Sequence, residues 1–283
     1  MEWINEANVL IVGLGLIGGS YARALKRLGF CVSAIDTDPD TIAYALQEKM
    51  IDQGSTDDSL LSEADCIILA LYPSLVKDWI RTHQDHFKSG VIITDVTGIK
   101  SAIVYDVQDI LRKDAEFIAA HPMAGREVCG VKNSTDRIFR DANYIVVPTE
   151  QNSQEAIRWC KNLGRVLGFL HISVLSPEEH DSMIAYVSQL THCIAVALMT
   201  CEDNAHLKDY TGDSFRDLTR IARINEDMWT ELFFMNRQPL LDRLDTFIEE
   251  LSSIRDLIEC EDEEGLKEKM RLSTKRRSTF DRN

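Results

Sequence analysis

Residues 9–20, VLIVGLGLIGGS, restrict the possible folds of this chain more than any other segment. An apolar, β-rich run leads directly into a Gly-x-Gly-x-x-Gly motif at Gly13, Gly15 and Gly18, and a helical pattern follows. The first glycine allows a tight turn, the second lets the backbone approach a pyrophosphate, and the third lets the helix pack closely on the sheet. The helix N-terminus also offers unpaired N–H groups to phosphate oxygens. The segment therefore predicts a strand–turn–helix unit that binds a dinucleotide.

The next β-rich run ends at Asp36, 18 residues after Gly18, close to the position where a carboxylate binds the ribose hydroxyls of a dinucleotide. A carboxylate there would repel the 2′-phosphate of NADP, and residues 35–40, IDTDPD, contain no arginine to receive it. We therefore predict NAD as the cofactor; the alternative is a glycine turn that binds no nucleotide. The predicted cofactor-contacting residues are Gly13, Gly15, Leu16, Ile17, Gly18, Asp36, Leu71 and Thr97.

Short β-rich runs alternate with helical patterns as far as about Val174, which is typical of a parallel sheet covered by helices on both faces. The runs lie at residues 9–13, 31–36, 66–71, 91–96, 116–121, 144–148 and 169–174. Beyond them Ser176 and Pro177 have the character of a helix N-cap and first helical residue, and the remaining sequence is helical. We predict an α/β protein in which an N-terminal Rossmann-type doubly wound sheet, residues 1–174, is followed by an all-helical domain, residues 175–283.

The charge and the cysteines of the chain limit its partners and its compartment. The net charge of −15 argues against a nucleic-acid-binding surface, although a site's local charge can still favour a small anionic substrate. The seven cysteines are odd in number and never spaced CxxC, which argues against a disulfide framework or a structural zinc site. We find no secretory leader in MEWINEAN and no apolar run of membrane-spanning length, so we expect a soluble cytoplasmic protein that holds no metal.

Polar residues follow two of the predicted strands at the edge of the sheet where ligands bind in doubly wound folds. They are Asp95, Thr97, Gly98 and Lys100 after one strand, and His121, Arg126 and Glu127 after another. A histidine titrates near neutrality, which suits acid–base work, so His121 is a candidate catalytic residue. Taken alone, a histidine at the end of a strand is more often a structural hydrogen-bonding group than a catalyst.

The helical region adds two pairs of polar residues. Ser188 and His192 are four apart and therefore share one helix face, where His192 lines a ligand pocket or is a core histidine. Asp217 and Arg220 are three apart, which predicts an ion pair between them. That pair is either an ordinary surface contact or a guanidinium held in place for a substrate carboxylate.

Taken together and in order, these segments resemble the prephenate dehydrogenase family over residues 8–260. The segments are GLGLIGGS with its following Asp36, DVTGIK, HPMAGRE, SQLTH after EEHD, and FRDLTRIA followed by MW. The glycine motif is common to many dehydrogenases, whereas HPMAGRE combined with FRDLTRIA and MW is far more specific. The resemblance implies NAD-dependent oxidative decarboxylation of prephenate to 4-hydroxyphenylpyruvate in tyrosine biosynthesis.

The resemblance also implies roles for individual residues. His121 would accept the hydrogen bond of the substrate hydroxyl, and Arg220, oriented by Asp217, would bind a substrate carboxylate. Ser188 and His192 would line the pocket from a helical domain that forms a homodimer interface.

The chain departs from the family pattern at GDSF, where Asp213 and Ser214 replace glycines, and at two candidate site positions. Gly98 stands where many members have serine, which makes Thr97 the nearest hydroxyl and a candidate catalytic residue. Arg126 stands where threonine is frequent; with Glu127 it is a candidate contact to an anionic substrate. His180 also matches a family position, but in the first turn of its helix it reads equally well as solvated surface.

Three other functions are alternatives. The first is an arogenate (cyclohexadienyl) dehydrogenase, and the second is a β-hydroxyacid dehydrogenase. The second needs a lysine in the helical domain, and Lys208, the only lysine between Pro177 and Gly265, lies outside any motif that we recognise. The third is an NAD-sensing protein without catalysis, which leaves His121, His192 and Arg220 without a role.

Overall fold

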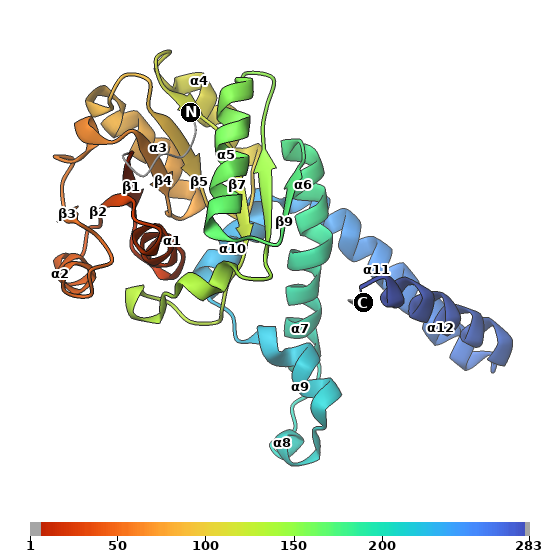
Figure 1. The fold of residues 1–283 in the computed structure, drawn as a ribbon. Coiled ribbons are helices and arrows are strands. Elements are labelled where there is room, and N and C mark those ends of the chain that lie inside the picture. Colours follow the sequence, from red (N-terminus) through yellow and green to blue (C-terminus); the bar gives the residue numbers. More distant parts are fainter. Residues whose placement is uncertain (1–6, 281–283) are drawn as a thin grey trace. The chain divides into compact units, whose positions relative to one another are not determined.

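The computed structural model describes residues 7–280 and divides into two compact units, which meet in sequence between Asn236 and Arg237 (Figure 1). The residues that we predict to act in cofactor binding, substrate binding and catalysis all belong to the first unit. The helices between residue 175 and Asn236 are part of that unit as well, so the compact units do not divide at residue 174. Most of MEWINEAN, on which we judged the absence of a leader, lies outside the described residues.

The main sheet of the first unit has six parallel strands in the order β3-β2-β1-β4-β5-β6. This arrangement confirms the α/β, Rossmann-type fold; β3 was not predicted from the sequence. The strands are β1 (Asn8–Val12), β2 (Cys31–Ile35), β3 (Gln53–Ser55), β4 (Cys66–Leu69), β5 (Ile92–Asp95) and β6 (Glu116–Phe117).

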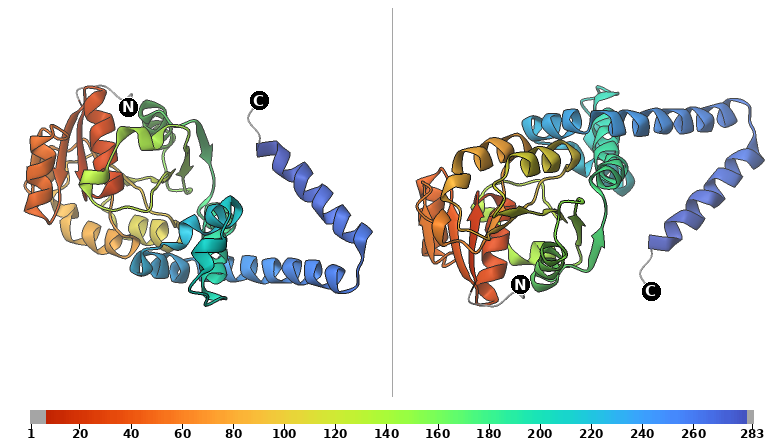
Figure 2. Two further views of the ribbon diagram at one scale, coloured as in Figure 1. Left: turned by 90° about the horizontal axis from the view of Figure 1, so that it is seen from below. Right: turned by 90° about the horizontal axis from the view of Figure 1, so that it is seen from above.

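Helices cover both faces of this sheet (Figures 1 and 2). Because side chains alternate along a strand, Val9 and Ile11 join the core under α1, α2 and α5, whereas Leu10 and Val12 join the core under α3 and α4. These residues are at most 2% exposed, which explains why β1 is apolar at every position after Asn8. The helices are α1 (Leu16–Arg27), α2 (Pro39–Gln47), α3 (Pro73–His83), α4 (Ser101–Ile110) and α5 (Gln154–Leu167).

A second, three-stranded sheet was not predicted. It consists of β7 (Ala119–Met123), β8 (Asn143–Val147) and β9 (His171–Val174), with β7 antiparallel to β8 and β9 parallel to it. The run that we predicted as one strand, 116–121, is therefore divided between β6 and β7 at Ile118. Beyond that point the chain leaves the main sheet, and the Ala120 amide donates to the Asp95 side chain at 3.1 Å.

Helices make up the rest of the first unit, as predicted. Ser176 caps α6 and exchanges reciprocal hydrogen bonds with Glu179. The elements are α6 (Pro177–Ile184), a π-helical turn η5 (Ala185–Gln189), α7 (Leu190–Thr200), α8 (Leu207–Tyr210), α9 (Asp213–Thr219), the 3-10 turn η6 (Arg220–Ala222) and α10 (Glu226–Met235). Short 3-10 turns elsewhere in the unit are η1 (Leu61–Glu63), η2 (Gln84–His86), η3 (Val131–Asn133) and η4 (Asp136–Phe139).

The continuous helical run Pro177–Thr200 is apolar and long enough, by length and composition alone, to cross a membrane, contrary to our expectation from the sequence. Its most apolar window has a mean hydropathy of 1.5, and 28% of that window is buried. Three polar side chains of this run, His180, Asp181 and Gln189, are buried inside the first unit. Such anchoring is typical of a helix that belongs to a globular domain.

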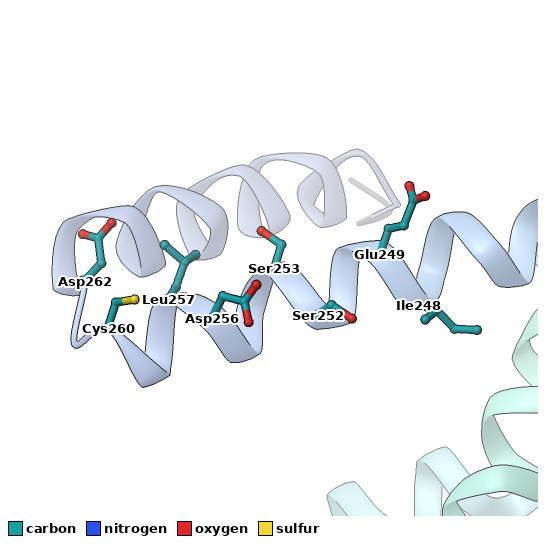
Figure 3. Close-up of a pocket in the computed structure, with 8 residues that line it drawn as sticks. All are labelled: Ile248, Glu249, Ser252, Ser253, Asp256, Leu257, Cys260 and Asp262. Carbon is teal, nitrogen blue, oxygen red and sulfur yellow. The ribbon is translucent and has the colours of Figure 1, made fainter.

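The second unit is a pair of helices, α11 (Arg237–Glu259) and α12 (Glu263–Arg277), followed by the 3-10 turn η7 (Ser278–Phe280). The chain reverses at Glu261, and the Asp262 side chain caps α12 by accepting from the Gly265 amide. Figure 3 shows an open hollow along α11 and this turn. Its lining is Ile248, Glu249, Ser252, Ser253, Asp256, Leu257, Cys260 and Asp262. With three carboxylates and no basic side chain, it is unsuited to an anionic substrate.

Candidate active site

The glycine motif forms a turn that leaves space above its middle glycine. Gly13 has a φ of +89°, and a Cβ added there would lie 2.6 Å from the Ala70 carbonyl oxygen. A Cβ on Gly18 would lie 1.9 Å from the Gly13 carbonyl oxygen. No heavy atom lies within 4 Å of a Cβ placed on Gly15. Gly13 and Gly18 are thus needed for the fold, whereas Gly15 keeps the surface open for a ligand.

The start of α1 offers free amides at this turn. The Gly19 amide donates to the Gly15 carbonyl at 3.0 Å and makes the first hydrogen bond of the helix. The amides of Leu16 and Ile17 precede it and have no acceptor within the helix. They are placed to bind phosphate oxygens, which fits the pyrophosphate of a dinucleotide. Within residues 7–280, no group of three or more histidine, cysteine or acidic side chains could hold a metal ion.

Asp36 lies at the end of β2 and fixes the glycine turn. Its carboxylate accepts from the Leu14 amide at 2.7 Å and from the Asp38 amide at 2.9 Å. Leu71 reaches the same turn, with a methyl group 3.4 Å from a Cβ placed on Gly13. The predicted cofactor residues, apart from Thr97, therefore meet around one turn.

His121, on β7, is half-buried and bonded through one ring nitrogen. Its Nδ1 lies 2.9 Å from Nε2 of His180 on α6, and the two rings meet edge to face. His180 is fully buried, so the solvated surface position that we considered for it is wrong. Its Nδ1 lies in turn 2.8 Å from the Asp181 carboxylate. Burial, and next the neighbouring His180 and Lys100, hold the pKa of His121 well below its ordinary value, so the ring is neutral.

A buried ion pair lies behind His121. Lys100 Nζ is 2.6 Å from the Asp95 carboxylate and 3.0 Å from the Thr97 hydroxyl, and both charged side chains are 0% exposed. The Thr97 hydroxyl also bonds Asp95 and the Ile99 carbonyl. Its single proton is therefore donated inside the protein, to Asp95 or to the Ile99 carbonyl, and the residue is buried. The contacts of Thr97 to a substrate and to the cofactor stay predictions.

Gly98 leaves space beside the His121 ring. A Cβ placed on Gly98 would lie 3.9 Å from Cε1 and from Nε2 of His121, and 3.5 Å from a methyl carbon of Leu232. The second ring nitrogen of His121, which is not bonded to His180, thus lies next to a position without a side chain. A Cβ at this position would make only ordinary van der Waals contacts.

Arg220 is bound to a different carboxylate from the one that we predicted. On η6, it forms an ion pair with Glu127, which follows β7. Asp217 is exposed, and among the described residues it makes no ion pair with Arg220, because α9 ends at Thr219 and the chain tightens into η6. Arg126 points to the Asn133 carbonyl, to which it donates a hydrogen bond.

His192 is stacked on an aromatic side chain. Its ring centroid lies 3.6 Å from that of Trp229 on α10, and its Nδ1 is 2.9 Å from the Ser188 carbonyl. Burial lowers the pKa of His192, so this ring is also neutral near pH 7. The shared helix face of Ser188 and His192 exists, and the contact uses the main chain of Ser188.

Two models of known families match this chain. One describes the nucleotide-binding domain of prephenate dehydrogenase and matches residues 21–168; the other describes its dimerization domain and matches residues 176–272. The chain belongs to the prephenate dehydrogenase family. It is therefore a dehydrogenase with a domain for a nicotinamide dinucleotide, as the glycine turn independently indicates.

Similar proteins within the prephenate dehydrogenase family differ in the substrate after which they are named. The prephenate dehydrogenase of Bacillus subtilis is 32% identical over 91% of this chain and 72% of its own length. A crystal structure of the prephenate dehydrogenase of A. aeolicus, in complex with hydroxyphenyl propionate and NAD+, is 29% identical with a TM-score of 0.90, covering 99% of this chain and 100% of that one. A crystal structure of the Synechocystis arogenate dehydrogenase is 26% identical with a TM-score of 0.84, and the match covers 97% of this chain and 100% of that one.

The sequence analysis did not predict that His180 and Asp181 are buried and connected to His121. The helical spacing of Pro177, His180, Asp181 and Ile184 is the signal that was available, because all four are buried on one face of α6. Because His180 and Asp181 are polar, this face of the helix did not appear apolar in the sequence. A histidine–aspartate pair on the apolar face of a helix indicates a buried network.

Proposed function

We propose that this protein is an NAD-dependent prephenate dehydrogenase that converts prephenate to 4-hydroxyphenylpyruvate in tyrosine biosynthesis. The observation that carries the proposal is the environment of His121. One ring nitrogen is bound to His180, and the other lies beside Gly98, which has no side chain. Six residues after His121, in the loop that follows β7, Glu127 forms an ion pair with Arg220. The guanidinium of Arg220 is a cation suited to binding a substrate carboxylate.

The proposed chemistry removes a hydride and CO2 from one small dianion and moves the hydroxyl proton to His121 and back. Bound nicotinamide supplies the hydride acceptor for the ring carbon that carries the hydroxyl. His121 Nε2 accepts the hydroxyl proton as the carbon–oxygen double bond forms. The ring carboxylate then leaves as CO2, and its electron pair completes the aromatic ring. His121 returns the proton to the phenolic oxygen, which balances the reaction, and its lowered pKa keeps it ready to accept the next one.

Arg220 is the proposed carboxylate clamp. Its side chain is 65% exposed, so a substrate carboxylate can reach it and compete with Glu127. Glu127 then releases the guanidinium when an anion binds and holds it when the site is empty. We do not assign Asp217 a part in the clamp, because the ion-pair partner of Arg220 is Glu127.

The remaining substrate contacts come from His192 and Arg126. The Ser188 carbonyl occupies Nδ1 of His192, which leaves Nε2 to face a substrate. Trp229 supports the ring by stacking. Arg126 is exposed and adds a positive charge next to Glu127, which favours prephenate because its side chain carries no amino group.

Asp36 supports NAD rather than NADP. Its carboxylate carries a negative charge at the end of β2, and the two backbone amides that it binds hold it in place. Measuring kcat/KM with each cofactor tests this assignment. We expect a preference for NAD, and Asp36→Ser should reduce it. A wild-type preference for NADP would overturn the assignment.

Arogenate is the alternative substrate, supported by the likeness to the Synechocystis arogenate dehydrogenase. The test is to follow NADH absorbance with NAD and, separately, prephenate and arogenate. We expect the higher kcat/KM with prephenate. We also expect Arg126→Thr to narrow the difference, whereas replacing the exposed Arg165 on α5 should not. A higher kcat/KM with arogenate would replace the first proposal by the second, and no NADH with either substrate would refute both.

We further propose a cytoplasmic homodimer, with a domain boundary near residue 174. Apolar side chains on α6, η5 and α7 are 42–57% exposed: Met183, Tyr186, Val187 and Met199. A second copy would cover such a surface. The match of residues 176–272 to a dimerization domain supports both points. Sedimentation equilibrium should give twice the 32.1 kDa mass of the chain, and a monomer at micromolar concentration would contradict the proposal.

A further inference from the structure

A chain of hydrogen bonds connects His121, through His180, to the buried carboxylate of Asp181. His121 Nδ1 is 2.9 Å from His180 Nε2, and His180 Nδ1 is 2.8 Å from Asp181 Oδ1. His180 is 0% exposed and Asp181 is 4% exposed, so no water competes for these contacts. The order of the three groups allows the position of each proton to be worked out.

Asp181 is held as an acceptor. Its two carboxylate oxygens accept from the amides of Lys100 and Ser101, each at 2.8 Å, at the start of α4. Burial raises the pKa of this carboxyl, but the hydrogen bonds from His180 and Ser101 outweigh that effect, and the pKa lies below its ordinary value. An ionised carboxylate has only lone pairs to offer.

The protons of both histidines follow from this. Because Asp181 can only accept, His180 must carry its proton on Nδ1. Burial lowers the pKa of His180 despite Asp181, so the ring is neutral and its Nε2 is an acceptor. His121 therefore donates from Nδ1, and its own ring is neutral. Its remaining nitrogen, Nε2, is left with a lone pair, beside Gly98.

We propose that His180 and Asp181 are positioning residues that fix His121 in the tautomer with an unprotonated Nε2. The use of that nitrogen, acceptance of the substrate hydroxyl proton, rests on the proposed function. The opposite tautomer would present an N–H to the hydroxyl and could not take its proton. In a serine protease, losing the carboxylate that sets the histidine tautomer costs about 10⁴-fold in turnover.

We call His121, His180 and Asp181 the relay. The charges around the relay favour the state in which His121 holds the proton that it has accepted. Lys100 is bound to Asp95, and the two charges compensate each other. Within residues 7–280, Asp181 forms no ion pair with a lysine or arginine; it is compensated by backbone amides and by His180. With both imidazoles neutral, this group of side chains carries one positive and two negative charges, a net charge of −1. The proton that His121 accepts therefore neutralises the network.

The first test is the tautomer itself, read from the ¹⁵N chemical shifts of protein labelled at its seven histidines. The His121 signals are assigned by their loss in His121→Asn. We expect a protonated Nδ1 and an unprotonated Nε2 for His121 in the wild type at pH 7.5. A protonated Nε2, or two nitrogens averaged by exchange, would overturn the proposal. This reading needs no substrate, so it stands apart from any failure of the dehydrogenase assignment.

The second test is a matched pair of variants at His180. His180→Gln can still place an acceptor opposite His121 Nδ1, whereas His180→Phe fills the space without one. We expect kcat with the active substrate to fall by about 10-fold in His180→Gln and about 10²–10³-fold in His180→Phe, with KM changed less than about 3-fold. The Phe variant should also show His121 in mixed tautomers. Equal losses in both variants, or an unchanged tautomer in His180→Phe, would contradict the relay.

Discussion

Arg220 and Glu127 form an ion pair across 93 positions of the sequence and connect η6 to the loop that follows β7. That loop follows the strand of His121, so the pair brings a cation from the helical part of the unit to the loop next to the strand of the proposed base. Both side chains are partly exposed, so the pair itself contributes little to stability. The importance that we propose for it lies in binding a substrate anion.

Arg220→Ala should raise the KM for the substrate by about 10- to 100-fold, because a charge-assisted hydrogen bond to a carboxylate is lost. Stability should change little. Arg216→Ala is the matched control, since Arg216 lies on α9, is similarly exposed and is 3.9 Å from its partner Asp213. Steady-state kinetics on both variants decide the point. An unchanged KM in Arg220→Ala would exclude the clamp.

Two alanine substitutions in the glycine motif should fail in different ways. Gly15→Ala should fold normally and bind NAD at least about 10-fold more weakly, because only the ligand needs that space. Gly18→Ala should destabilise the protein by roughly 1–3 kcal/mol, because its Cβ would collide with the Gly13 carbonyl. NAD titration and chemical denaturation separate the two effects. Normal NAD affinity in Gly15→Ala would remove this turn from the cofactor site.

Lys100→Met should lower the free energy of unfolding by about 3–5 kcal/mol, because Asp95 would remain as a buried carboxylate without its cation. Lys77→Met breaks an exposed pair with Asp106 and should cost at most about 1 kcal/mol. Urea denaturation of both variants provides the comparison. Similar losses would show that the Lys100–Asp95 pair is not the internal support that its burial indicates.

Stability should fall as the pH is lowered below about 6.5, the ordinary pKa of histidine. His121, His180 and His192 all have lowered pKa values in the folded protein. Below about pH 6.5 the unfolded chain therefore binds protons that the folded chain does not, whereas above it both states are neutral. Each histidine can contribute a slope of up to about 1.4 kcal/mol per pH unit.

The measurement is the free energy of unfolding between pH 5 and 8. His180→Phe should reduce the acid-side slope, and the exposed His171→Gln should not. A free energy of unfolding that stays constant from pH 7 to pH 5 would mean that the three rings are not held neutral.

Local sequence patterns were sufficient where neighbouring residues determine the structure. The Ser176 cap depends on residues within one turn of chain, and the sequence predicted it. The glycine turn and Asp36 at the end of β2 were also predicted from short local patterns, although their contacts reach Ala70 and Leu14. The α/β fold followed for the same reason, since most of the strands in the main sheet are short apolar runs; β3, Gln53–Ser55, is not, and it was missed.

Contacts between distant segments could not be predicted in this way. The i,i+3 spacing indicated Asp217 as the partner of Arg220, whereas the guanidinium bonds Glu127 from another element. Likewise, β6 and β7 appeared as one strand because their separation depends on the Asp95 side chain, which accepts from the Ala120 amide. His180 appeared as surface because the amides that hold Asp181 lie 80 and 81 positions away.

The central claim is that His121 takes the proton while NAD takes the hydride from prephenate. The most direct test compares wild-type protein and His121→Asn, following NADH and CO2 together with NAD binding. We predict one NADH for each CO2 in the wild type. In His121→Asn we predict turnover lowered by about 10²–10⁴-fold, with NAD affinity unchanged. Wild-type turnover in His121→Asn, or no NADH from prephenate in the wild type, would contradict the account.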